Sequence, residues 1–183
     1  MRVVVWFSCG AASACAAKFA IEKYGKDRVS VVYCNTFPEE HKDNSRFMKD
    51  VEEWLDISIT IIGSAKYSSP TDVFERAGYM SGPMGARCTV ELKKVPRFAF
   101  QKADDIHVFG FTADKKELNR MQNFKFNNPE LNLDWVLRDN KITKAMCYKI
   151  LIDAGIKLPE MYLLGYKNNN CIGCVKASSP GYW

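Results

Sequence analysis

The chain of 183 residues contains only two histidines, and it has no long hydrophobic run and no internal repeat. Neither His41 nor His107 stands in a recognisable pattern with a serine or cysteine, so a Ser-His-Asp or Cys-His hydrolase is disfavoured. No stretch approaches the roughly 20 apolar residues of a membrane span, and the apolar run at residues 3–7 is too short for a signal-peptide core. These absences predict a soluble, cytoplasmic protein that has no membrane partner.

A segment that would act as a linker between domains is also missing, and the length fits one domain. Hydrophobic residues make up 47% of the chain and charged residues 26%, which is ordinary globular usage. We therefore expect a single domain over residues 1–183. The net charge of +5 suits an anionic partner, either a nucleotide or a nucleic acid, and does not choose between them.

Alternating strand and helix patterns indicate the fold class. Apolar, β-branched runs predict strands at residues 3–7, 29–34, 57–62 and 106–111. Helical spacing follows the first strand up to about Lys23, a second helix begins at Asn44 or Ser45, and a third runs from Thr89 to about residue 103 with a break at Pro96. These units predict an α/β fold: a doubly wound, mainly parallel sheet with helices on both faces.

Two regions lack such periodicity. Residues 63–86 are rich in Ser, Pro and Gly and predict a long loop with a short helical stretch near residues 73–76. Residues 112–129 also predict a polar loop, and Thr143 then caps a further helix on which Cys147 faces inward. The last segment, residues 165–183, contains three consecutive asparagines and two cysteines, so we expect something other than packing to order it.

Seven cysteines in a chain without a secretion signal favour metal binding or reactive thiols over a disulfide framework. Cys171 and Cys174 form a C-x-x-C turn that can reach one metal ion or cluster, and the distant Cys88 and Cys147 can complete the coordination. A redox pair is the alternative, but the motif does not open a helix after a strand. The remaining three are expected to be small buried hydrophobic residues: Cys9, Cys15 and Cys34.

A candidate phosphate loop, residues 8–13, separates the first strand from the first helix. Its small residues allow backbone N–H groups and the helix N-terminus to surround a phosphate or sulfate, at the strand end where open α/β sheets bind ligands. A tight turn with no ligand is the alternative. Of the basic residues, Lys93 and Arg97 are expected on a solvated helix face, whereas Lys115, Lys116 and Arg120 follow the fourth strand and can contact an anionic substrate.

Several motifs, in order, resemble the phosphoadenosine phosphosulfate (PAPS) and adenosine phosphosulfate (APS) reductase family of the adenine nucleotide alpha hydrolase, or PP-loop, superfamily. Residues 8–13 resemble its Ser-Gly-Gly-x-Asp-Ser loop, and residues 35–39 its Asp-Thr-Gly…Phe-Pro-Glu segment. Residues 87–96 resemble its cysteine, Lys and Pro pattern, and residues 110–120 its Gly-x-Arg-x-x-Glu…Arg segment. Asp134-Trp135 and residues 164–174 resemble its Asp-Trp and Gly-Tyr…Cys-x-x-Cys ending.

The resemblance implies an adenine nucleotide, accompanied by Mg²⁺ in the pyrophosphatase members, and a 4Fe-4S cluster. The nucleotide-binding residues that it implies are Ser8, Cys9, Gly10, Ala11, Ala12, Ser13, Asn35, Thr36, Gly110, Thr112, Asp114 and Arg120. The substrate contacts that it implies are Glu39, Lys93, Lys115 and Lys116. The metal ligands that we expect are Cys88, Cys147, Cys171 and Cys174, with Zn²⁺ as the alternative to the cluster. The family also allows a homodimer and a reductant protein as partners.

The chain departs from the family at positions that matter for the reaction. Ala12 stands where the loop has an acidic residue, and Thr112 where the reductases have an arginine. In the family, the cysteine at the position of Cys88 is one of two adjacent cysteines, but its neighbour here is Arg87. The fourth ligand is therefore open: Cys147 is the candidate and Cys9 the alternative. The sequence ends at Trp183, nine residues after Cys174, and no residue is assigned as the nucleophile of the family's C-terminal tail.

The leading hypothesis is an enzyme that binds ATP or an adenylyl sulfate type of nucleotide and transfers sulfur to a nucleic-acid or small-molecule acceptor. A PAPS or APS reductase that forms sulfite is the first alternative. A family member that binds a nucleotide without turnover is the second. The third is a protein that is not an enzyme, in which zinc stabilises the cysteine site and the basic face binds nucleic acid.

Overall fold

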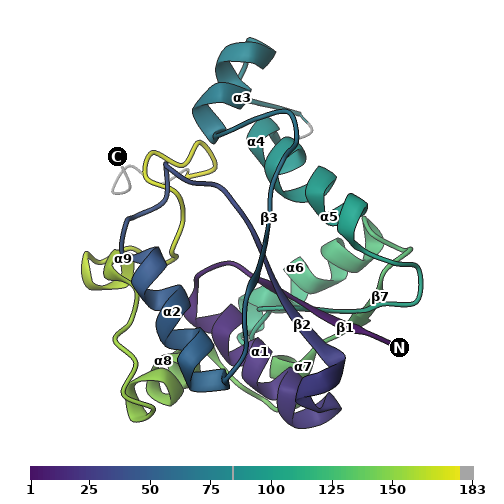
Figure 1. Ribbon diagram of the computed structural model, residues 1–183, viewed down its shortest axis with the longest axis vertical. Coiled ribbons are helices and arrows are strands. Elements are labelled where there is room, and N and C mark those ends of the chain that lie inside the picture. The colour runs from purple at the N-terminus through teal and green to yellow at the C-terminus, as the bar shows by residue number, and fades with distance from the viewer. Residues whose placement is uncertain (84, 178–183) are drawn as a thin grey trace.

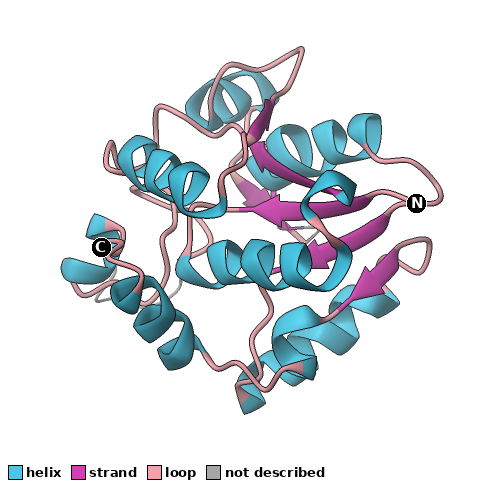
Figure 2. Ribbon diagram, turned by 60° about the horizontal axis from the view of Figure 1, so that its bottom comes forward, coloured by secondary structure: helices cyan, strands magenta, loops and turns pink. Residues whose placement is uncertain are grey.

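The computed structural model describes residues 1–83 and 85–177. Within them, five parallel strands form one sheet in the order β3-β2-β1-β6-β7, and helices flank it (Figures 1 and 2). The strands are β1 (Val3–Phe7), β2 (Val29–Cys34), β3 (Thr60–Ile62), β6 (Ile106–Phe109) and β7 (Asn132–Asp134). The expected α/β class, the parallel sheet and the single compact domain are confirmed.

The apolar runs of the strands are buried on both faces of the sheet. Val3, Val5 and Phe7 of β1 pack into one core, whereas Val4 and Trp6 pack into another on the opposite face, because successive side chains of a strand alternate. The first core also contains residues of four helices: α1 (Ala11–Tyr24), α2 (Asn44–Leu55), α7 (Val136–Asp139) and α8 (Lys144–Asp153). Continuous Val-rich strands are therefore what this sheet requires.

The strand order reverses between β1 and β6. Val3 of β1 pairs with Val29 of β2 on one side and with Ile106 of β6 on the other, and all three strands are parallel. The chain passes from β1 through β2 to β3 on one side of the sheet, and later adds β6 and β7 on the other. The loops after β1 and β6 therefore diverge at one point of the carboxyl edge, where doubly wound sheets form a crevice.

The other elements surround this sheet. The segment expected as a long loop contains α3 (Pro70–Ala77) and a hairpin of β4 (Ser81–Gly82) and β5 (Gly85–Ala86). It leads into α4 (Arg87–Thr89), a π-helical turn (Val90–Lys94) and α5 (Val95–Phe100). Later elements are α6 (Lys115–Phe126), α7 (Val136–Asp139) and α9 (Glu160–Leu163), and a 3₁₀ turn (Lys26–Arg28) follows α1.

Several element predictions need correction. The third strand begins at Thr60, and the helix expected from Thr89 begins at Arg87 and ends at Phe100. The polar stretch after β6 contains α6, whose only fully buried side chain is Met121, so it carries no apolar stripe that sequence periodicity could detect. The short elements β7, α7 and α9 were not predicted. The cap at Thr143 is confirmed, since its hydroxyl accepts the backbone N–H of Met146 at 3.3 Å.

Arg97 was expected on a solvated helix face, and this expectation is wrong. Its side chain is buried, donates to Asn128 Oδ1 at 2.9 Å and lies over the rings of Phe98 and Phe124. The π-helical turn before Pro96 adds a residue to the helical turn and changes which side chains face the core. Among the described residues, no helix is long and apolar enough to cross a membrane.

Candidate functional site

The loop after β1 is folded around the Ser13 side chain. Ser13 Oγ accepts the backbone N–H groups of Ser8 at 3.1 Å and Gly10 at 3.3 Å, and it donates to the carbonyl of Gly10 at 2.8 Å. Ser13 itself lies in the first turn of α1, so its hydroxyl ties the loop to the helix N-terminus. Two of the N–H groups that would face a phosphate are therefore held by the loop itself.

Cys9 gives the loop its sharp turn. Its φ of +52° lies in the left-handed region, which a non-glycine residue adopts at some cost. The side chain is fully buried, and burial raises the pKa of its thiol. The sulfur of Cys9 is thus protonated and packed in the core, as expected for a small buried hydrophobic residue, as is that of Cys15.

Gly110 brings the loop after β6 against the loop after β1. A Cβ atom on Gly110 would lie 2.8 Å from the backbone nitrogen of Ser13 and 3.0 Å from the carbonyl carbon of Ala12. Only glycine allows the two backbones to approach this closely. Two segments that the sequence assigned to the nucleotide, residues 8–13 and Gly110, therefore meet at the crevice where the strand order reverses.

Thr112 and Asp114 have a structural role beside Gly110. The hydroxyl of Thr112 donates to Asp114 Oδ2 at 2.6 Å, and the backbone N–H of Lys144 donates to the same oxygen at 2.8 Å. These two hydrogen bonds lower the pKa of Asp114. The pair joins the loop after β6 to the start of α8.

The C-terminal segment covers the phosphate loop. Tyr162 of α9 accepts the backbone N–H of Ala11 through its hydroxyl at 3.3 Å. The amide of Asn169 donates to the Cys9 carbonyl at 2.5 Å and to Asn44 Oδ1 at 2.8 Å. The sequence analysis did not identify Tyr162 or Asn169, because neither stands in a family motif and α9 is too short to show periodicity.

The segment after β2 forms the adjoining wall. Thr36 is buried and its hydroxyl donates to Glu40, whose carboxylate also accepts Tyr33 Oη at 2.7 Å and Asn44 Nδ2 at 2.6 Å. Asn35 Oδ1 accepts the backbone N–H of Phe37 at 3.0 Å. Asn35 also lines a cavity of about 380 Å³ between this segment, α2 and the exposed side chain of Ile61. Sequence reasoning missed Glu40, which organises this wall.

Three of the four expected cysteine ligands line one cavity of about 660 Å³. Cys88 comes from α4, and Cys171 and Cys174 come from the C-x-x-C turn. In Figure 1 the segment that carries this turn (yellow) lies beside the loop after β2, and the backbone N–H of Ile172 donates to the Glu39 carbonyl at 2.7 Å. The tertiary structure thus brings Cys88 to the same cavity as two thiols that follow it by 83 or more residues in the chain.

The electrostatics of these thiols are set by burial and by Lys93. Burial raises the pKa of Cys88, and it raises the pKa of Cys171 to about 11, while the Lys93 ammonium acts in the opposite direction on both. Thr36 also acts against the rise in the pKa of Cys171. Lys93 is exposed, and its ammonium also acts against the rise in the pKa of Cys9 and of Cys34.

Cys147 lies elsewhere. It is fully buried on α8 in the core beside α1, where its carbonyl oxygen is 3.6 Å from Cys15 Sγ. It does not line the cavity of the other three cysteines. The inward direction that the sequence predicted for Cys147 is correct, and it leads to the hydrophobic core, away from the cavity that the other three cysteines line.

The three thiols at this cavity are the candidate ligands of a cluster or a metal ion. In the described part of the chain, no three His, Cys, Asp or Glu side chains are arranged to hold one metal ion. A zinc ion needs its sulfur ligands within about 2.3 Å of one centre, whereas an iron–sulfur cluster is bound by thiolates that are further apart. Cys88, Cys171 and Cys174 line one cavity, and the Lys93 ammonium acts on the pKa of Cys88 and Cys171.

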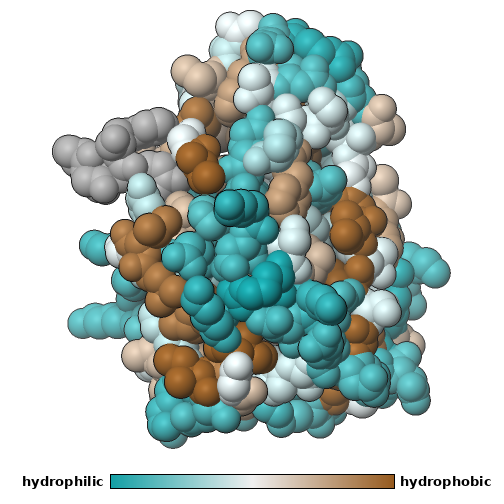
Figure 3. Space-filling model, turned by 60° about the vertical axis from the view of Figure 1, so that its left-hand side comes forward, coloured by the Kyte–Doolittle hydropathy of each residue, from teal (hydrophilic) through white to brown (hydrophobic). Residues whose placement is uncertain are grey.

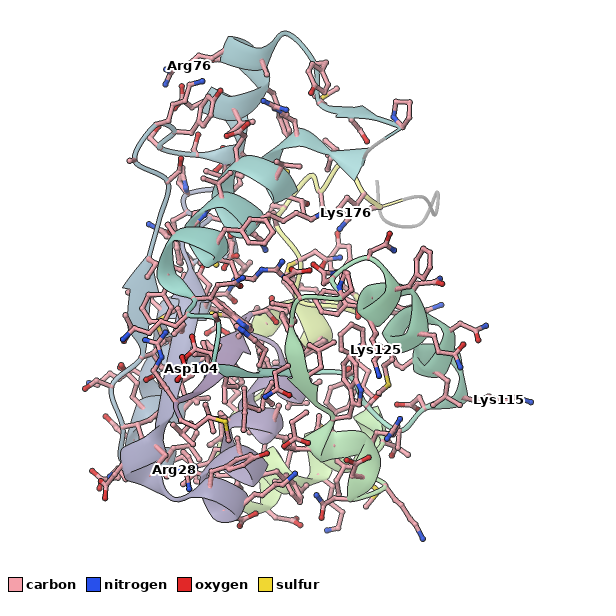
Figure 4. The ribbon with its side chains drawn as sticks, turned by 90° about the vertical axis from the view of Figure 1, so that its right-hand side faces the viewer. Arg28, Arg76, Asp104, Lys115, Lys125 and Lys176 are labelled. Carbon is pink, nitrogen blue, oxygen red and sulfur yellow. The ribbon has the colours of Figure 1, made fainter. Side chains whose placement is uncertain are left out.

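The basic residues after β6 are less closely tied to the site. Lys115, Lys116 and Arg120 are exposed on α6, and Lys115 points away from the body of the molecule (Figure 4). Arg120 pairs with Glu117 at 2.7 Å.

Burial lowers the pKa of Lys144, and the charges of Lys116 and Arg120 lower it further. The sequence missed Lys144, whose ammonium donates to Asn168 Oδ1 at 3.0 Å and anchors the C-terminal segment.

The surface around the C-terminal segment has a mixed character. Figure 3 shows the side of the molecule on which α9 lies, and hydrophobic residues there form separate groups among hydrophilic ones.

Comparison with known proteins gives no assignment, because no family model matches the chain and no curated protein matches it significantly. The proposal below therefore depends on the geometry of the site and on the resemblance of the motifs.

Proposed function

We propose that this protein is a sulfur-transfer enzyme of the PAPS reductase type that binds an adenine nucleotide at residues 8–13 and an iron–sulfur cluster on Cys88, Cys171 and Cys174. The observation that carries the proposal is the placement of these three thiols around one cavity, which Asn169, two residues before Cys171, connects to the phosphate loop. The nucleotide half is supported by the position of the loop where the strand order reverses.

Two contacts link the two halves of the proposed site. Asn169, two residues before Cys171, donates to the carbonyl of Cys9 in the phosphate loop. Thr36, in the segment after β2, lies close enough to Cys171 to lower the pKa of its thiol. A nucleotide that lies along residues 8–13 and 35–36 would therefore end close to the cysteine cavity, as transfer of sulfur to an activated acceptor requires.

The residues of the chain have separate roles in this proposal. The N-terminus of α1 binds the phosphate, and Ser13, which accepts the N–H groups of Ser8 and Gly10, fixes the shape of the loop. Lys93 offsets the negative charge of the thiolates. Cys88, Cys171 and Cys174 would hold the cluster, which would supply an iron without a protein ligand at which sulfur could be carried. Gly110 keeps the loop after β6 close enough to exclude water from the crevice.

Anaerobic purification followed by iron, sulfide and zinc analysis and a visible absorption spectrum tests the cluster. We expect about four irons and four sulfides per chain, and loss of most of both in Cys171→Ala and Cys174→Ala. Cys34→Ala is the matched control, because Cys34 is half-buried at the end of β2 and does not line the cavity. Stoichiometric zinc without iron would overturn the proposal.

Calorimetric titration with ATP, PAPS and APS tests the nucleotide half. We expect binding of at least one of them with a Kd in the micromolar range. Formation of sulfite from PAPS or APS with thioredoxin as the reductant would contradict sulfur transfer to an acceptor and identify a reductase instead. Absence of binding by all three nucleotides would overturn the assignment of residues 8–13.

A further inference from the structure

The cavity beside the three cysteines has the size and lining of a small-molecule site. Its volume of about 660 Å³ lies within the roughly 300–1,000 Å³ that such sites occupy. Its walls come from α3, from the β4 strand of the hairpin and from the C-x-x-C turn. Apart from the thiols, most of the lining side chains are apolar: Pro70, Phe74, Met80, Ile172 and Val175.

Glu39 places one carboxylate in this largely apolar lining. Its Oε1 accepts the backbone N–H of Thr71 at 3.0 Å, and its carbonyl accepts the N–H of Ile172 at 2.7 Å. Its Oε2 is buried and has no hydrogen-bond partner among the described residues. The residue is thus fixed between α3 and the C-x-x-C turn with one acceptor oxygen unused.

An unused carboxylate oxygen in a buried position is costly. An ionised carboxylate only accepts hydrogen bonds, and a buried acceptor without a donor costs about 1–3 kcal/mol or more. A ligand with an N–H donor would remove that cost, and a positively charged donor would do so most effectively. An anionic ligand would meet repulsion from the same oxygen.

We infer that the sulfur acceptor is a small molecule with a compact apolar or aromatic body and an N–H donor group that binds Glu39 Oε2 in this cavity. Its body packs against Phe74, Met80 and Ile172, which places it beside Cys88, Cys171 and Cys174. Its role as an acceptor rests on the proposed function, whereas its binding in the cavity does not.

Benzamidine is the probe that tests this inference, because it combines a flat apolar ring with an amidinium that pairs with a carboxylate through two N–H groups. Benzoate is its matched anionic control of nearly the same shape. Both are titrated calorimetrically into the anaerobically purified protein, whose iron content is measured in the same samples. We expect benzamidine to bind at least tenfold more tightly than benzoate.

Substitutions then locate the site. Glu39→Gln keeps an oxygen for the Thr71 N–H and removes the charge, and we expect it to weaken benzamidine at least tenfold. Glu75→Gln, on an exposed position of the same α3 helix, is the matched control and should leave affinity unchanged. Ser81→Phe fills the rim of the cavity from an exposed strand position, so it should weaken binding even if Glu39→Gln disturbs α3.

The outcomes separate this inference from the proposed function. Equal affinity for benzamidine and benzoate, or full affinity in both Glu39→Gln and Ser81→Phe, would overturn the inference while an iron-loaded protein still supported the proposed function. Binding that depends on Glu39 in a protein without iron would uphold the site and overturn the sulfur-transfer proposal.

Discussion

The hydroxyl oxygen of Tyr162 lies 3.3 Å from the backbone nitrogen of Ala11 and accepts its hydrogen bond. Ala11 is the first residue of α1, so this N–H is one of the unpaired donors that a helix N-terminus offers to an anion. Tyr162 therefore occupies a position that a nucleotide phosphate would take, and a ligand at the loop must displace it.

The first prediction concerns this competition. Tyr162→Phe removes the hydroxyl and leaves the Ala11 N–H without its partner, so we expect the affinity for the bound adenine nucleotide to rise about fivefold, which corresponds to roughly 1 kcal/mol for one hydrogen bond. Calorimetric titration measures the change. Tyr148→Phe, the neighbouring tyrosine on α8, is the control. Unchanged or weaker binding by Tyr162→Phe would show that the phosphate does not use this N–H.

The second prediction concerns the contact between the loops after β1 and β6. Gly110→Ala places a Cβ atom 2.8 Å from the Ser13 nitrogen, so the two backbones must separate. We expect the free energy of unfolding to fall by about 1–3 kcal/mol and the nucleotide affinity to fall at least tenfold. Urea unfolding and calorimetry check both.

Gly82→Ala is the matched control for that experiment. A Cβ atom on Gly82 would have no neighbour within 4 Å among the described residues, and Gly82 does not have a positive φ. We expect a change in unfolding free energy within about 0.5 kcal/mol. A stable Gly110→Ala protein with full affinity would mean that the close approach of the two loops is not required.

The third prediction concerns Asp43, whose carboxylate accepts hydrogen bonds from Arg46 and from the first residue of α9. Arg46 donates to both Asp43 oxygens, at 2.7 Å each, and the backbone N–H of Glu160 donates to Oδ2 at 2.9 Å. The Arg46 hydrogen bonds, followed by that of Glu160, lower the pKa of Asp43 below its ordinary value. In the folded protein the ionised form is therefore favoured.

The pH dependence follows from this direction. The stabilisation is complete above the unfolded-state pKa of about 3.9 and is lost as the pH falls through the lower folded-state pKa. We expect Asp43→Asn to lower the unfolding free energy at pH 7 by about 1 kcal/mol and to flatten its fall below pH 4. Asp104→Asn, at an exposed position, should change neither. A wild-type slope retained in Asp43→Asn would contradict the assignment.

The fourth prediction separates Cys147 from the cluster. Because Cys147 packs in the core against Cys15, Cys147→Ala should lower the unfolding free energy by about 1 kcal/mol through lost packing. Its iron and sulfide content after anaerobic purification should equal that of the wild-type protein. Loss of iron comparable to that in Cys171→Ala, with the fold retained by circular dichroism, would restore Cys147 as a ligand.

The amino-acid sequence determined the strands β1 and β2, the helices α1, α2 and α8, and the short loop between β1 and α1. The Val-rich runs at β1 and β2 were predicted at their observed bounds because fully buried parallel strands need continuous apolar residues. The helices α1, α2 and α8 were predicted from end signals, such as the Thr143 cap, and from apolar spacing. The polar helix α6 and the short α9 were missed, because neither has an apolar stripe of sufficient length.

Only the tertiary structure decided which chemical groups meet. Long-range packing placed Cys88 next to the C-x-x-C turn and Cys147 in the core, and nothing in the spacing of the cysteines distinguishes these two positions. The same is true of Tyr162 over Ala11 and of Glu39 beside the thiols, since each contact joins segments from different elements. Local propensity and periodicity act over a few residues, whereas a site is formed by the relative placement of whole strands and helices.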